Sequence, residues 1–241
     1  MKRYTNRMHS TTHIAANLEH LRATVADAAL CAGRRPEDVQ LIAVSKNQPA
    51  EAVAAAVAAG QRAFGENTVQ DALTKISGFA GQGLEWHFIG HLQSNKAKHI
   101  PGNFAWLHSL DSVQLAQRLA RLAREQNMAI NTLIEVNITH DPAKHGVTVE
   151  NVAPLLDALL KAGLPGLHLR GLMAIGSHPA TETGARVNFA RLRELRDELQ
   201  KRFGLKNFNE LSMGMSGDYA AAIQEGSTMV RVGTAIFGQR E

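Results

Sequence analysis

A lysine stands where an apolar run ends, a position that can make its amine reactive. Lys46 closes the run 39–45, and Pro49 follows three residues later. This pattern predicts a buried strand that ends in a turn. Burial disfavours the ammonium form and lowers the pKa of a lysine, and a neutral amine is what Schiff-base formation requires. Because a lysine at a strand end more often extends its amine into solvent, this hypothesis depends on other segments.

Two turns of small residues are typical of a phosphate cradle. Residues 212–218 read Ser-Met-Gly-Met-Ser-Gly-Asp and run from a predicted strand end into a predicted helix start. Glycines let backbone N–H groups approach an anion, and a helix N-terminus adds a favourable dipole. Ser216 could cap that helix or bind the anion. A second small turn, Gly233-Thr234, follows the last predicted strand, so the two turns together predict a phosphate site.

Other residues with chemical potential give weaker signals. Arg231 lies in an otherwise apolar segment, 229–232, and a buried arginine needs an acceptor. The sequence leaves open whether that acceptor is a ligand or a carboxylate in a structural ion pair. The eleven histidines show no spacing with carboxylates that is typical of a metal site, and no nucleophile elbow is present. We therefore predict no metal and no hydrolase of the Ser-His-Asp type.

The elements that would position these residues alternate between strand and helix. A parallel sheet with helical crossovers follows from this alternation, and eight units in one chain predict a single (β/α)₈ barrel, an α/β fold. An open doubly wound sheet is the alternative, but no G-x-G-x-x-G turn follows the first strand. The predicted strands are 40–46, 62–66, 86–90, 106–110, 131–137, 168–174, 210–213 and 229–236.

Helical patterns lie near 50–60, 68–78, 93–99, 112–127, 149–162, 183–203 and 217–225. An extra amphipathic helix near 13–33 precedes the first strand. We expect residues 1–12 to be a mobile N-terminal tail and residues 13–241 to form one domain, because no linker or low-complexity segment interrupts them.

The barrel prediction brings polar residues to one face. Active sites of such barrels lie at the carboxyl ends of the strands. The strand ends carry Lys46, Asn67, His91, Ser109 and Asn137, and the last two strands add the two small turns and Arg231. Polar loops are common in any fold, so it is the gathering of all these residues at one face that indicates a ligand site.

Composition narrows the class of protein. The chain has 241 residues, 44% of them apolar and 20% charged, with a net charge of +4 and only 5% aromatic residues. No block of like charges or stacking surface indicates a nucleic-acid partner. The single cysteine, Cys31, favours a reducing compartment. We find no secretory signal and no apolar run long enough to span a membrane, so we expect a cytoplasmic protein without a membrane partner.

Longer motifs resemble one family. Leu211-Ser-Met-Gly-Met-Ser216 and Met229-Val-Arg-Val-Gly-Thr-Ala-Ile-Phe-Gly238 are the most distinctive, and Ala43-Val-Ser-Lys46, Phe64-Gly-Glu-Asn67, Trp86-His-Phe-Ile-Gly90, Leu92-Gln-Ser-Asn-Lys96 and 169–175 also match. These stretches, spread from about residue 14 to residue 240, resemble the YggS/PROSC family of pyridoxal-phosphate-binding homeostasis proteins. The resemblance implies one barrel similar to the N-terminal domain of alanine racemase.

The resemblance also implies roles for individual residues. Lys46 would hold pyridoxal 5'-phosphate as a Schiff base, Arg231 would face the pyridine nitrogen, and Asn67 would lie near the ring. Lys144 matches a lysine implicated in secondary or transfer binding of the cofactor. The residues expected around the phosphate are Ser212, Gly214, Ser216, Gly233 and Thr234.

Three positions depart from the family pattern. Gln48 replaces a second lysine, which puts any auxiliary role of that amine in doubt. His91 stands where many members have proline, and Gly217 stands where an acidic residue is common. None of these departures removes the lysine that forms the Schiff base.

Two functions remain open. The chain is either a binding protein that holds the cofactor and influences its supply to other apoenzymes, or an amino-acid racemase or related enzyme. Alanine racemase is understood to need a tyrosine as second acid or base and carries an extra β domain, whereas this chain has only Tyr4 and Tyr219 and ends at Glu241. An arginine at the pyridine nitrogen also weakens the ring as an electron sink. We therefore expect a mainly monomeric binding protein without catalytic turnover.

Overall fold

The computed structural model describes residues 2–176 and 182–238, with side chains from residue 13 onward and from residue 184 in the second range. One sheet of parallel strands closes into a barrel in this part of the chain. The strand order is β4-β3-β2-β1-β9-β8-β7-β5, and pairing of β4 with β5 completes the ring, while the short β6 adds to β5 outside it. The predicted (β/α)₈ barrel is thereby confirmed. The strands are β1 (Gln40–Val44), β2 (Ala63–Glu66), β3 (Glu85–Phe88), β4 (Trp106–Leu110), β5 (Ile130–Asn137), β6 (Val147–Thr148), β7 (Leu167–Ala174), β8 (Glu210–Ser212) and β9 (Met229–Val232).

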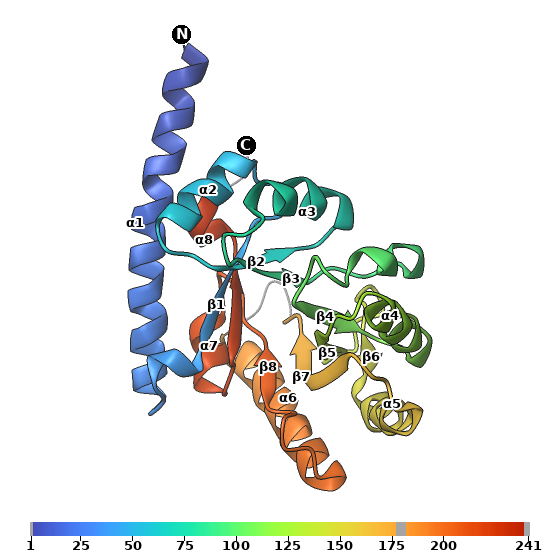
Figure 1. Cartoon of the computed structure of the whole chain (residues 1–241). Helices are drawn as coiled ribbons and strands as arrows, with labels where there is room; N and C mark the ends of the chain where they lie inside the picture. The colour runs from blue at the N-terminus through green and yellow to red at the C-terminus, as the bar shows by residue number, and fades with distance from the viewer. Residues whose placement is uncertain (1, 177–181, 239–241) are drawn as a thin grey trace.

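Helices surround the strands, as Figure 1 shows. Their starts follow ordinary capping rules; the Ser112 side chain, for example, accepts a hydrogen bond from the Leu115 amide at 3.4 Å and begins α4. The helices are α1 (Lys2–Cys31), α2 (Ala50–Ala58), α3 (Val69–Ile76), α4 (Val113–Glu125), α5 (Val149–Ala162), α6 (Glu182–Phe203), α7 (Tyr219–Gln224) and α8 (Thr234–Phe237), with short 3₁₀ turns η1 (Pro36–Asp38), η2 (Ser77–Phe79) and η3 (Ser94–His99).

Alternation along the strands separates two apolar cores. Side chains such as Phe64 and Phe88 point outward and pack beneath the helices. The opposite faces of the strands fill the barrel itself. That inner cluster is small, so the barrel interior has room for polar side chains. Its members are Ile42, Ala63, Trp106, Leu133, Met173 and Met229.

Helix α1 lies outside the barrel and packs against α2, α7 and α8. It begins at Lys2, so the predicted helix start near residue 13 was wrong. Figure 1 shows its N-terminal turns extending past the rest of the molecule. The buried residues Ile14, Leu18, Leu21 and Val25 recur at helical spacing and hold its second half in place. Mobility of residues 1–12 and the domain limits remain predictions.

The last strand is shorter than the sequence predicts. β9 ends at Val232, and residues 234–237 form α8 instead of continuing the strand to residue 236. Gly233 leaves the extended conformation, with φ −116° and ψ −68°, and its carbonyl accepts the amides of Ile236 and Phe237, both at 2.9 Å. The apolar run across this point hid the turn, because a short apolar run fits strand and helix equally well. Among the helices of the described residues, none combines the length and apolar character needed to cross a membrane.

Candidate functional site

Lys46 follows β1 at the carboxyl-terminal face of the barrel. Its side chain is half-buried, and Ser45 before it is fully buried. Asn47 adopts a left-handed backbone conformation with φ 60°, which asparagine tolerates better than most residues, and turns the chain away from the strand. The structure thus places the lysine at the edge of the barrel interior, as the apolar run predicted.

A buried ionic network supports the backbone on both sides of Lys46. The Lys75 amine in α3 donates to the Ser45 carbonyl at 2.7 Å, to Glu66 Oε1 at 2.8 Å and to Asp71 Oδ2 at 2.9 Å. The Ser45 hydroxyl donates to the same Glu66 oxygen at 2.6 Å, and the Asn47 amide donates to Asp71 Oδ2 at 3.0 Å.

The sequence analysis missed this network, although Asp71 and Lys75 stand four residues apart on a predicted helix, the spacing of a side-chain pair. Burial raises the pKa of Glu66, while its bonds to Lys75 and Ser45 oppose that rise. The network therefore binds strand β2 and helix α3 to the segment that carries the candidate nucleophile.

The two small turns lie on strands close to Lys46. β1 pairs with β9 in a register that sets Ala43 opposite Val232, so the ends of these strands are neighbours. A Cβ on Gly233 would stand 3.2 Å from the Val44 carbonyl oxygen, which shows how closely this turn follows β1. Thr234, the next residue, is exposed.

The turn after β8 requires glycine for its shape. Gly214 has φ +94°, and a Cβ there would lie 2.6 Å from the Ala222 Cβ in α7. Asp218 accepts the Met215 amide at 2.6 Å, which closes the turn. Ser216, in the same turn, is half-buried. Ser216, Gly233 and Thr234 thus lie at one face, where backbone and hydroxyl groups can meet an anion.

Arg231 and Ser212 form a pair inside the barrel. Arg231 is 5% exposed and donates from Nη1 to Ser212 Oγ at 2.5 Å and from Nη2 to the Ala174 carbonyl at 3.0 Å. Burial lowers the pKa of Arg231 to about 10, and Glu135 and Asp218 oppose that shift. The sequence analysis grouped Ser212 with the phosphate turn, but its hydroxyl is fully buried and binds Arg231 and His108. Ser212 therefore contacts the arginine directly.

Glu135 is a buried carboxyl that the sequence analysis missed. It lies in β5, is 5% exposed, and its Oε2 has no hydrogen-bond partner among the described residues. The pKa of Glu135 is raised to about 7, mainly by burial and also by the nearby Asp111, while Arg231 opposes the rise. Glu135 lies two residues after Leu133 in the predicted strand, so alternation along the strand places both on one face, and this is the signal that could have found it.

The remaining predicted residues surround the same face. Asn67 follows β2 and is half-buried. The Lys144 amine donates to the Gly176 carbonyl at 2.8 Å, just beyond β7. His91 stacks on His145 with ring centroids 4.1 Å apart. Gln48 is half-buried beside the Lys46 turn.

Two other predicted strand-end residues are buried. Ser109 is 1% exposed, and its hydroxyl lacks a hydrogen-bond partner among the described residues. The Asn137 side chain donates to the Asp141 carbonyl at 2.7 Å and so holds the loop that carries Lys144.

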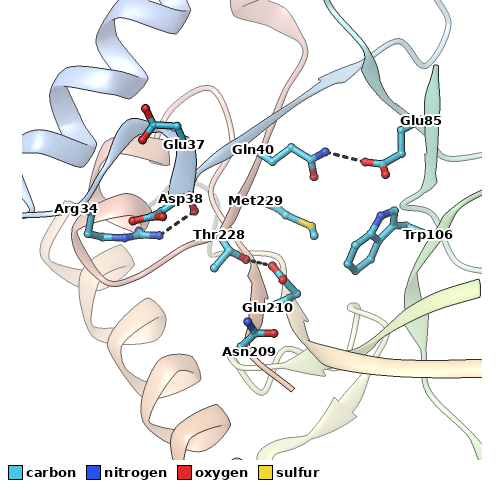
Figure 2. Close-up of a pocket in the computed structure, with 10 residues that line it drawn as sticks. All are labelled: Arg34, Glu37, Asp38, Gln40, Glu85, Trp106, Asn209, Glu210, Thr228 and Met229. Atoms are coloured by element: carbon cyan, nitrogen blue, oxygen red, sulfur yellow. Dashed lines mark hydrogen bonds between the residues drawn. The ribbon is translucent and has the colours of Figure 1, made fainter. Parts of the chain in front are cut away.

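A cavity of about 520 Å³ opens at the other end of the barrel. It is lined mostly by the first residues of strands and the segments before them, as Figure 2 shows. The carboxyl-terminal face, and not this cavity, holds Lys46 and the glycine turns, so we assign the candidate site to that face. The cavity is lined by Arg34, Glu37, Asp38, Gln40, Glu85, Trp106, Asn209, Glu210, Thr228 and Met229.

Comparison with known proteins gives consistent results. Residues 10–241 match the family described as alanine racemase, N-terminal domain. The pyridoxal phosphate homeostasis protein of Pseudomonas aeruginosa is 46% identical over 228 residues, which are 95% of this chain and 96% of that protein. The protein of the same name from Escherichia coli K12 is 44% identical over 236 residues, 95% of this chain and 97% of that protein.

Solved structures agree with the fold. PipY of Synechococcus elongatus, described as having PLP bound, superposes with a TM-score of 0.82 at 40% identity, covering 93% of this chain and 100% of PipY. Alanine racemase of Clostridium difficile has a TM-score of 0.71 at 15% identity over 95% of this chain and 57% of the racemase, a likeness that shows the fold alone. The chain belongs to the alanine racemase N-terminal domain family and, within it, to the pyridoxal phosphate homeostasis proteins.

Proposed function

We propose that this chain binds pyridoxal 5'-phosphate on Lys46, holds it, and influences its supply to other enzymes without turning over a substrate of its own. The observation that carries this proposal is the meeting of Lys46 with two glycine turns at one end of the barrel, on the paired strands β1 and β9 and on neighbouring β8. Close relatives are named for pyridoxal phosphate homeostasis, and the PipY structure is described with PLP bound.

The residues present fit this cofactor. The Lys46 amine would condense with the cofactor's aldehyde and release one water molecule. Ser216, Gly233 and Thr234 would receive the phosphate, and Gly214 gives its turn a conformation that a larger residue would strain. Arg231 would direct a guanidinium N–H group toward the pyridine nitrogen, and Asn67 would lie beside the ring. The network around Lys75 would keep the Lys46 backbone in place for binding.

The geometry favours a binding protein over a racemase. A bound pyridoxal ring supplies an electron sink for carbanion chemistry, and a protonated pyridine nitrogen strengthens that sink. Arg231 has only N–H donors, so it would hold that nitrogen unprotonated. The Tyr219 hydroxyl shares a hydrogen bond of 3.0 Å with Thr24 Oγ1 in α1, outside the barrel, so it is not directed at the candidate site. These contacts support the absence of turnover that we propose.

Lys144 offers a secondary binding site for the cofactor during its release. Its amine lies at the same face, bound to the Gly176 carbonyl beyond β7. We propose that Lys144 takes part in secondary binding and that PLP-dependent apoenzymes are the recipients. Each of the eight strands in the ring is paired on both sides, which supports a mainly monomeric protein. We place it in the cytoplasm.

Borohydride reduction of the protein loaded with pyridoxal phosphate tests the central claim. We expect a yellow protein whose label is fixed on the peptide that contains Lys46. Lys46→Ala should lose the covalent label, whereas Lys144→Ala should keep it. A label found only on another lysine would contradict the assignment, and chiral analysis after incubation with each L-amino acid would reveal any racemisation.

A further inference from the structure

Buried polar side chains cross the inside of the barrel between its two mouths. Glu85 and His87 occupy alternate positions of β3, His108 lies in the neighbouring β4, and Ser212 ends β8. His87, His108 and Ser212 are fully buried. We call these four residues the polar relay. Its inner end, Ser212, accepts a hydrogen bond from Arg231, the arginine at the candidate site.

Four hydrogen bonds connect these four residues and Arg231 without a break. Glu85 Oε1 lies 2.9 Å from His87 Nε2, and His87 Nδ1 lies 3.0 Å from His108 Nε2. His108 Nδ1 lies 2.9 Å from Ser212 Oγ, which in turn lies 2.5 Å from Arg231 Nη1. Both nitrogens of both imidazole rings are therefore used within the relay.

The protons in this series have one consistent arrangement. Arginine can only donate, and an ionised carboxylate can only accept. Burial lowers the pKa of His87 and lowers that of His108 well below its usual range, so both rings are neutral. His87 then donates from Nε2 to Glu85, His108 donates from Nε2 to His87, and Ser212 donates to His108 Nδ1. Arg231 donates to the lone pair that remains on Ser212.

Glu85 and Arg231, at the two ends of this series of hydrogen bonds, carry opposite charges. The hydrogen bonds lie among fully buried side chains, where hydrogen bonds polarise one another. The His87 ring also stacks nearly parallel to Trp106, with the ring centroids 5.8 Å apart. Each group that donates a hydrogen bond becomes a better acceptor on its other side. The carboxylate of Glu85 thus strengthens the oxygen of Ser212 as an acceptor for Arg231.

We infer that Glu85, His87, His108 and Ser212 are positioning residues for Arg231, and that a carboxylate at one mouth of the barrel sets the orientation of the guanidinium at the other. This inference rests on the proposed function, in which Arg231 meets the pyridine nitrogen. Ser212 and the Ala174 carbonyl bind different guanidinium nitrogens, so together they fix the plane in which the remaining N–H groups lie.

The outer end of the relay reaches the cavity at the amino-terminal mouth. The Glu85 side chain is 39% exposed there. It also accepts a hydrogen bond from Gln40 Nε2 at 2.7 Å. Figure 2 draws this bond as a dashed line. His87 beyond it is fully buried. The relay therefore leads from a partly exposed carboxylate through fully buried side chains to the candidate site. If these residues only satisfied one another's hydrogen bonds, changing Glu85 would alter stability but not the surroundings of Arg231.

Nuclear magnetic resonance of the full chain without cofactor tests the arrangement itself. With ¹⁵N-labelled histidine, His87 and His108 should each carry the proton on Nε2 and none on Nδ1. With ¹⁵N-labelled arginine, the Arg231 guanidinium, assigned by its loss in Arg231→Lys, should rotate slowly. Glu85→Gln should shift the His108 and Arg231 signals, although neither residue contacts Glu85. A His108 proton on Nδ1, or an Arg231 signal that ignores Glu85→Gln, would overturn the inference.

Cofactor binding tests the consequence at the site. Ser212→Ala should raise the Kd for pyridoxal phosphate about tenfold, because a hydrogen bond to a charged group is lost, and should shift the absorbance maximum of the bound cofactor. Ser212→Thr keeps the hydroxyl and should restore both values. Ser227→Ala is the matched control: Ser227 is equally buried, but its hydroxyl donates to backbone carbonyls. Glu85→Gln should shift the absorbance maximum in the same direction as Ser212→Ala.

The two sets of measurements separate this inference from the proposed function. Label on Lys46 together with unshifted spectra in Ser212→Ala and Glu85→Gln would retain the proposed function and overturn the inference. A wild-type protein that binds no cofactor on Lys46 would overturn the proposed function and this inference, even with the expected tautomers, because Arg231 would then have no pyridine nitrogen to face. Expected tautomers, coupled signals and shifted spectra together support the relay as the device that positions Arg231.

Discussion

Gly90 lies directly against Asn67, so closely that a Cβ on Gly90 would stand 2.1 Å from the Asn67 carbonyl oxygen. The backbones after β2 and β3 touch at this point. Any side chain at residue 90 must therefore displace the segment that presents Asn67 to the candidate site.

Gly90→Ala should weaken cofactor binding and lower stability. The alanine forces the Asn67 backbone to move, and overpacking of this kind costs about 1–3 kcal/mol. Thermal unfolding and cofactor titration measure the two effects. Gly78→Ala is the control, since a Cβ there meets nothing within 4 Å. Equal stability and equal cofactor affinity of the two variants would show that the Asn67 backbone accommodates the added Cβ without loss of free energy.

Lys75→Met should destabilise the protein by about 3–5 kcal/mol, because it leaves the Glu66 carboxylate buried without its cation. Denaturant unfolding measures this loss. Adding Glu66→Gln should recover part of it, since the unpaired charge disappears. The variant should also slow covalent labelling of Lys46, whose neighbour Ser45 loses a backbone partner.

Lys161→Met is the matched control for that experiment. Lys161 pairs with Asp157 at 2.6 Å and at the same four-residue spacing as Lys75 and Asp71, but its side chain is 75% exposed. Its loss should cost less than about 1 kcal/mol. A similar loss in both lysine variants would contradict the role that we assign to burial.

Glu135→Gln should change the dependence of stability on pH. Burial raises the pKa of Glu135 from 4.5 to about 7, so between these values the folded protein keeps a proton that the unfolded chain has lost. The free energy of unfolding contributed by this group is therefore greatest below pH 4.5 and falls as pH rises through 7.

The glutamine variant has no such proton to lose. Relative to wild type, its free energy of unfolding should rise between pH 4.5 and about pH 8 by about 3 kcal/mol at most. Urea unfolding across this range measures the difference. Glu125→Gln, at an exposed position of α4, is the control. A constant difference between Glu135→Gln and wild type would show that Glu135 ionises normally in the folded state.

Arg231→Glu should shift the absorbance of bound pyridoxal phosphate or its dependence on pH. A carboxylate near the pyridine nitrogen favours protonation of that nitrogen, whereas the arginine opposes it. Arg231→Gln removes the charge without adding the opposite one and should give a smaller change. If the glutamate variant folds and binds the cofactor with an unchanged spectrum and titration, Arg231 does not face the nitrogen.

Strand periodicity and strand ends were readable from the sequence, and they placed Lys46, Asn67 and the two glycine turns at one face of a barrel. Their positions depend on short apolar runs and on the parallel arrangement, which the alternation of strands with helical crossovers predicts. The end of β9 was misplaced because Gly233 turns within an apolar run.

Contacts between distant segments were not readable in the same way. Ser212 belongs to a segment whose composition is typical of a phosphate turn. The direction of its hydroxyl depends on Arg231 and His108, which lie on other strands. The local sequence does not distinguish Lys75 from a surface lysine of an amphipathic helix, because its burial depends on Glu66 in strand β2. His87 and His108 bind each other only because β3 and β4 are neighbours in the barrel.

Pairing of β1 with β9 joins the first and last strands of the ring. During synthesis, the segment with Lys46 leaves the ribosome long before the segment with Gly233, so a growing chain has the amine but not the turn that accompanies it. Contacts between such distant segments form late in folding. The candidate site therefore comes into being only when the barrel closes, and capture of the cofactor would mark a chain that has been finished as well as folded.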